Sequence, residues 1–87
     1  MDNFIEFMQQ YDELKKWHPN IYLHIKEFSR EPVRWRVHVF GKGMAYNRGD
    51  AELLFAEAES REEAFGEALK KLRGIENQIY NLKEIHR

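Results

Sequence analysis

The residues best suited to chemistry lie between positions 22 and 40, where aromatic, histidine and basic side chains recur at alternate positions. Imidazoles bind metal ions or transfer protons, and rings and arginines are common in protein interfaces. The same rings can also stack on bases while cations neutralise phosphates. The row that carries these options consists of Tyr22, His24, Lys26, Phe28, Arg34, Arg36, His38 and Phe40.

The residues outside this row give little indication of catalysis. The chain has no cysteine and no threonine, and its only serines, Ser29 and Ser60, suit a turn and a helix cap. The segment Gly41-Lys42-Gly43 is too short for a phosphate-binding loop and lacks a following Lys-Ser/Thr pair. Most carboxylates fall on predicted helix surfaces, where water would surround them rather than a desolvating pocket. We therefore expect a protein that is not an enzyme, with no catalytic residue and no cofactor.

A metal site would depend on His24 and His38. If the strands that carry them pair so that residue numbers sum to 62, the two imidazoles are directly opposed; a sum of 60 instead places His24 opposite Arg36. Zinc requires three or four ligands, and no third ligand is obviously directed at this position. We expect two surface histidines and no metal.

The first element predicted to support this row is a helix over residues 3–17. Asn3 is a candidate cap with Glu6 three positions later, and Pro19 ends the segment. Its apolar residues recur at helical spacing and form a broad stripe. They are Phe4, Ile5, Phe7, Met8, Tyr11, Leu14 and Trp17.

Two strands, 21–28 and 33–40, follow the helix and alternate with period two. The turn at 29–32 joins them into a predicted hairpin. The apolar row faces the core, and the row of aromatic, histidine and basic residues faces outward. The inward row is Ile21, Leu23, Ile25, Val33, Trp35, Val37 and Val39.

A third strand is predicted over 51–58, after a glycine-rich connection at 41–50. Its alternation is poor, because apolar residues occur in both phases. The core set is either Leu53 with Phe55, or Leu54 with the two alanines Ala56 and Ala58. The sequence leaves both assignments open.

The last predicted element is a helix over residues 60–86. Ser60 and Glu63 form a capping box, and apolar residues then step by three and four positions. Gly74, after the basic residues 70, 71 and 73, could end one helix and begin another. We favour one helix, kinked at Gly74, because the apolar phase continues through the glycine.

These elements predict one α+β domain over residues 1–87 in the order α-β-β-β-α. A three-stranded antiparallel meander would carry both helices on one face. A helix of this length extends about 40 Å, whereas the strands reach about 20–25 Å, so its last turns would overhang the sheet. Either the first helix or a second copy of the chain must cover the overhang. A homodimer would self-associate through Ile75, Ile79 and Leu82.

Composition narrows the partner and the compartment. Forty-three per cent of residues are hydrophobic, enough for one core, and the net charge is −1. Because nucleic-acid affinity is largely electrostatic, this balance favours a protein partner. The lack of cysteine favours a reducing, cytoplasmic location. We expect no signal peptide and no membrane span, because the N-terminus has no basic and apolar leader and no apolar run approaches 18 residues.

The segment 35–42, followed by 58–64 (Ala-Glu-Ser-Arg-Glu-Glu-Ala), is similar to part of the double-stranded-RNA-binding domain. The resemblance extends to the α-β-β-β-α order of nearly the whole chain. That family places a lysine cluster at the start of its last helix, on the RNA backbone. Here those positions hold Arg61, Glu62 and Glu63, whose carboxylates would repel phosphate. The resemblance therefore implies the fold and not RNA binding.

Residues 59–69 also resemble the strand-to-helix step of HicB-type antitoxins. Compact, cysteine-free chains of this kind are similar to accessory proteins of phages and mobile elements, many of which inhibit a host protein by direct binding. We therefore predict an interaction module, an inhibitor or adaptor, that binds another protein. The alternative is a nucleic-acid binder on the same face. The predicted partner-binding residues are Tyr22, His24, Lys26, Arg34, Arg36, His38 and Phe40.

Overall fold

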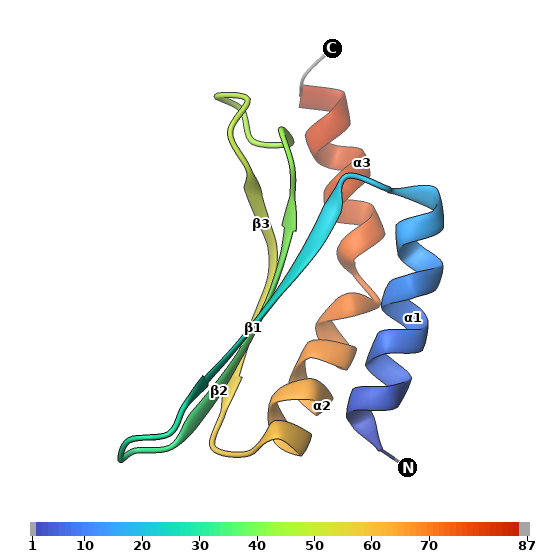
Figure 1. Cartoon of the computed structure of the whole chain (residues 1–87). Coiled ribbons are helices and arrows are strands. Elements are labelled where there is room, and N and C mark those ends of the chain that lie inside the picture. The colour runs from blue at the N-terminus through green and yellow to red at the C-terminus, as the bar shows by residue number, and fades with distance from the viewer. Residues whose placement is uncertain (1, 86–87) are drawn as a thin grey trace.

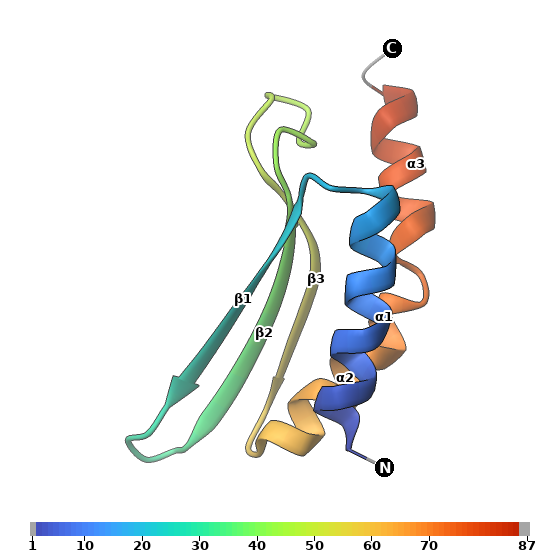
Figure 2. The same cartoon turned by 45° about the vertical axis from the view of Figure 1, so that its right-hand side comes forward.

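A computed structural model describes residues 2–85 and confirms the α+β class (Figure 1). The three strands form one antiparallel sheet in the order β1-β2-β3, and the helices form a second layer on one of its faces (Figures 1 and 2). The elements are α1 Asn3–Trp17, β1 Ile21–Phe28, β2 Arg34–Gly41, β3 Ala51–Ala58, α2 Arg61–Leu72 and α3 Ile75–Ile85.

Helix α1 has the bounds that the sequence predicted, but Asp2 and not Asn3 caps it. The Asp2 carboxylate accepts hydrogen bonds from the backbone N–H groups of Phe4 and Ile5, at 2.9 and 3.4 Å. Asn3 is the first helical residue, and its backbone N–H donates to the Glu62 carboxylate at 3.0 Å. Its side-chain amide donates to the Glu62 carbonyl at 3.1 Å. The starts of α1 and α2 are thereby joined.

The predicted hairpin is confirmed, and its register follows the sum of 62. Strands β1 and β2 pair antiparallel with Ile21 opposite Gly41 and His24 opposite His38. The inward row contributes fully buried Val37 and Val39 to the core. Two residues of the same row are exposed, Ile25 in the middle of the edge strand β1 and Val33 at the turn. The turn end of the hairpin extends away from the helices (Figure 2).

Strand β3 resolves the ambiguity of its two phases with a bulge. Val39 pairs with Leu54, whereas the next residue, Phe40, pairs with Glu52, so that Leu53 is the extra residue. An extra residue shifts the alternation by one position. Leu53 and Leu54 are therefore both buried, and Phe55 lies on the exposed face. The second predicted set, Leu54 with Ala56 and Ala58, therefore faces the core, and the bulge adds Leu53 to it.

The prediction of one helix over 60–86, kinked at Gly74, is wrong, and the alternative, in which one helix ends there and another begins, is observed. Helix α2 ends at Leu72 and α3 begins at Ile75, with Arg73 and Gly74 between them. The backbone N–H of Gly74 donates to the carbonyl of Lys71 at 3.1 Å, a bond that spans three residues rather than four and tightens the chain into a turn. Residue 86 of the predicted helix lies outside the described residues.

The core lies between the helices and the sheet, and aromatic rings join α1 to α2 within the helical layer. The Phe65 ring of α2 contacts Phe4 and Phe7 of α1 edge-on, with centroids 4.9 and 5.3 Å apart. Against β3, the Lys71 ammonium group donates to the backbone carbonyl of Phe55 at 2.6 Å. Small residues Ala64 and Ala68 let α2 approach its neighbours.

The chain itself covers the residues that were expected to mediate self-association. Ile75 is 1% exposed and Ile79 is fully buried, both within the same core cluster as the sheet residues. Leu82 is partly buried against that cluster. The expectation that Ile75 and Ile79 form a dimer surface is therefore wrong. The break at Gly74 contributes to this outcome, because α3 is a separate helix that packs on β3 rather than an overhanging extension of α2.

Candidate functional site

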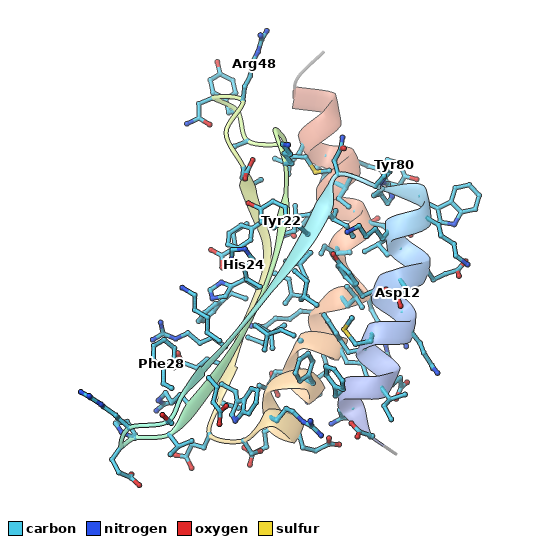
Figure 3. All side chains as sticks on the ribbon, viewed as in Figure 1. Asp12, Tyr22, His24, Phe28, Arg48 and Tyr80 are labelled. Carbon is cyan, nitrogen blue, oxygen red and sulfur yellow. The ribbon has the colours of Figure 1, made fainter. Side chains whose placement is uncertain are left out.

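The outer face of the sheet, which no helix covers in Figures 1 and 3, carries five aromatic rings in mutual contact. Phe40 lies at their centre. Its ring stacks on Tyr22 and His38, at centroid distances of 5.3 and 5.6 Å. His24 meets Phe40 edge-on at 5.5 Å, and Phe55 lies 5.0 Å from His38. We call this cluster the ring face: Tyr22, His24, His38, Phe40 and Phe55.

The ring face follows directly from strand geometry. Alternate residues of a strand face the same side, and the register places Tyr22 opposite Phe40 and His38 opposite Phe55. Opposed residues of neighbouring strands are close enough for their rings to pack. The structure thus brings together, on one face, all seven residues predicted as partner-binding.

Two of the predicted cations of this row are already paired. An Arg34 nitrogen lies 3.3 Å from the Glu57 carboxylate, and the Arg36 Nε donates to the same carboxylate. The Arg36 guanidinium also lies over the Phe28 ring, 4.6 Å from its centroid. Within residues 2–85, Lys26 is the cation of this row for which no ion pair forms. The face is consequently much less basic than the sequence of β1 and β2 suggested.

Carboxylates also border the ring face near its other end. Glu52 Oε1 lies 3.0 Å from His38 Nδ1. The Tyr22 hydroxyl donates to the Asp50 carboxylate, which also accepts the Gly43 N–H at 3.1 Å. These two hydrogen bonds lower the pKa of Asp50. The Tyr22 bond to the carboxylate in turn raises the pKa of the phenol.

Sequence reasoning missed the residues that β3 and the preceding loop contribute: Phe55, Glu52, Glu57 and Asp50. The bulge explains why Glu52, Phe55 and Glu57 were missed. Glu52 lies before the bulge and the other two lie after it, so they are in opposite phases of the sequence yet on one face of the sheet. Strict alternation could not have grouped them. The opposite charge of Glu57 and the arginines of β2 was a usable signal, but only once the register was known.

The opposed histidines do not form part of a larger ligand set. Among the described residues, no group of three or more histidine, cysteine or acidic side chains is arranged to hold a metal ion. Within the same range, no helix has the length and apolar character that crossing a bilayer requires.

Comparison with known proteins finds no protein-family profile, no curated protein and no solved structure that matches this chain.

Proposed function

We propose that this chain is a non-enzymatic module that binds another protein through the ring face and the ion pairs beside it. The observation that carries the proposal is the cluster of five contacting rings on a sheet face without helical cover. Protein interfaces concentrate aromatic side chains and arginine at their centre and polar groups at the rim. The rings and the surrounding Arg–Glu and His–Glu contacts have that arrangement.

The contacts within the face also favour tight association, because they order side chains before a partner arrives. Arg36 is held between the Glu57 carboxylate and the Phe28 ring. Immobilising a long side chain on binding costs about 0.5–1.5 kcal/mol, so prior ordering reduces the cost of association. A partner surface with an apolar centre and a few polar groups fits such a face.

The charge of the face favours a protein over a nucleic acid. Arg34 and Arg36 share Glu57, and Glu52 and Asp50 add further negative charge nearby. Carboxylates so close to the cations would repel a phosphate backbone, whose neutralisation dominates nucleic-acid affinity. The form that we favour is an inhibitor or adaptor that acts by occupying its partner's surface.

The test is affinity capture from the cells that carry the gene, comparing the wild-type chain with Arg36→Glu and Phe40→Ala. We expect each variant to lose at least about tenfold of the captured partner while remaining folded by circular dichroism. Arg30→Glu in the hairpin turn and Ile5→Ala on α1 are the controls, because both are exposed outside the ring face. Capture at wild-type strength by both ring-face variants would show that the partner binds elsewhere.

The nucleic-acid alternative is tested separately by fluorescence anisotropy with single- and double-stranded DNA and RNA. We expect no binding at 50 mM salt. Binding that weakens about tenfold or more between 50 and 200 mM salt, and that Arg36→Glu abolishes, would replace the protein-binding proposal with a nucleic-acid one.

A further inference from the structure

A second candidate site lies in the helical layer, on the other side of the sheet from the ring face. It is a surface pocket of about 380 Å³ where the C-terminal end of α1 meets α3. Two large aromatic side chains are exposed there, Trp17 at 75% and Tyr80 at 56%. Figure 3 labels Tyr80 beside the end of α1. The pocket is lined by Trp17, His18, Glu76 and Tyr80.

The lining groups share a preference for positive charge. Glu76 and Tyr80 are four residues apart on α3, so they occupy the same side of that helix. Trp17 and His18 are the last residue and the C-cap of α1, whose last turn also carries Lys15 and Lys16 against the negative end of the helix dipole. The attraction for a cation therefore comes from the Glu76 carboxylate and the aromatic ring faces.

His18 is a buried lining residue that packs against Tyr80. Only 5% of the residue is exposed, and its ring lies edge-on to Tyr80, with the two centroids 5.9 Å apart. Its Nδ1 atom is buried and has no hydrogen-bond partner among the described residues, so a ligand at the surface does not reach it.

A neighbouring groove gives a ligand room to extend. It has a volume of about 310 Å³ and shares Trp17 and Glu76 with the pocket. It adds Glu13, whose carboxylate pairs with Lys16 at 3.0 Å, and the guanidinium of Arg73. Arg73 is thus a cation of the protein itself that competes with a bound one.

We infer that this pocket binds the arginine side chain of a partner protein. A guanidinium is planar and stacks on an indole, pairs with a carboxylate, and presents five N–H donors. A lysine ammonium carries the same charge but has no planar group that could stack on an indole. The arginine would stack on Trp17 and pair with Glu76, while the peptide backbone follows the neighbouring groove. This inference is independent of the ring face, because its residues belong to a separate layer.

The experiment is an NMR titration of the ¹⁵N-labelled chain with the blocked peptide Ac-Gly-Arg-Gly-NH₂. The comparison peptides carry citrulline, which is isosteric and neutral, or lysine in place of arginine. We expect the arginine peptide to shift the Trp17 indole signal, assigned with Trp17→Phe, and the backbone signals around Tyr80. The citrulline peptide should bind at least about fivefold more weakly, and the lysine peptide should fall between them.

Variants of the protein give effects of opposite sign. Glu76→Gln should weaken the arginine peptide about fivefold, whereas Arg73→Gln should strengthen it by removing the competing cation. Glu67→Gln is the matched control, an exposed carboxylate on α2 outside the pocket. Equal binding of the arginine and citrulline peptides, or equal effects of Glu76→Gln and Glu67→Gln, would overturn the inference. Neither result bears on capture through the ring face.

Discussion

Phe40 is the side chain on which the arrangement of the ring face depends, because it contacts Tyr22, His24 and His38. We predict that Phe40→Ala lowers the free energy of unfolding by about 1–2 kcal/mol, since each cross-strand ring contact contributes up to about 1 kcal/mol. Phe55→Ala should cost about half as much, because Phe55 is more exposed and contacts His38 alone among the rings of the described chain. Urea denaturation measures both, and equal losses would contradict Phe40 as the centre.

The Tyr22–Asp50 hydrogen bond predicts a linked titration. The pKa of Asp50 is lowered, so its contribution to stability is present above about pH 4 and is lost as the pH falls through the lowered value. The pKa of Tyr22 is raised, so its contribution is present below about pH 10 and is lost as the pH rises through the raised value.

Asp50→Asn should therefore move the pKa of Tyr22 down toward its ordinary value, which a titration of the tyrosine ¹³Cζ signals would measure. Tyr11 is the internal control, because burial first and the nearby Asp12 second raise its pKa. Its titration should be unchanged in the variant. A Tyr22 pKa that stays raised in Asp50→Asn would show that the bond to the carboxylate is not its cause.

At the residue scale, the sequence was sufficient to place seven side chains on one face but not to predict their charge state. Alternation groups Tyr22 with Phe40, because the apolar row of each strand faces the core and leaves these two residues on the opposite side of the sheet. The pairing of Arg34 and Arg36 with Glu57 depends on the register between β2 and β3, which a sequence does not display. The basic surface expected from β1 and β2 therefore became a face of paired charges.

Among the elements, the bulge in β3 makes a prediction that strict alternation would not. Leu53 and Leu54 are adjacent in the chain, yet both are buried. We predict that Leu53→Ala and Leu54→Ala each lower the free energy of unfolding by about 2–4 kcal/mol, as for other buried leucines. Chemical denaturation of both variants measures this, with Phe55→Ala as the exposed comparison. A loss below about 1 kcal/mol for either leucine would show that the bulge is absent in solution.

The turn between α2 and α3 does not require a glycine at position 74. A Cβ there would lie 3.9 Å from the Lys71 carbonyl oxygen, an ordinary contact. Gly74→Ala should therefore leave stability unchanged or raise it by up to about 1 kcal/mol, by restricting the unfolded chain. Gly43, whose φ is +70°, is the contrast, and Gly43→Ala should cost about 1 kcal/mol. Thermal unfolding compares the two, and a loss in Gly74→Ala would contradict the turn.

The elements themselves were largely predictable, and the two irregularities were not. Period-two alternation located β1 and β2, and helical spacing located α1. The break at Gly74 was considered but not favoured, because Leu72, Ile75 and Ile79 keep their apolar phase across it. A periodic pattern indicates which face of a helix is buried. A break of two residues leaves that pattern unchanged when the same face is buried before and after it.

For the whole molecule, the burial of α3 separates core formation from association. Ile79 is fully buried, so Ile79→Ala should lower the free energy of unfolding by about 2–5 kcal/mol. It should leave the mass measured by sedimentation unchanged while the chain remains folded. Ile5→Ala, at an exposed position of α1, is the control and should cost little. A change of mass without loss of stability would restore Ile79 to an interface.

The bond from Lys71 to the Phe55 carbonyl has a consequence for how copies of the sheet could add to one another. It occupies a backbone acceptor of β3 that an incoming strand would otherwise use. In the described chain, no side-chain bond of this kind is made to the backbone of β1. Strand addition at the border of β3 is therefore less favourable than at the border of β1. If copies of the chain added only through β1, two of them would pair about a twofold axis and leave no free border for a third.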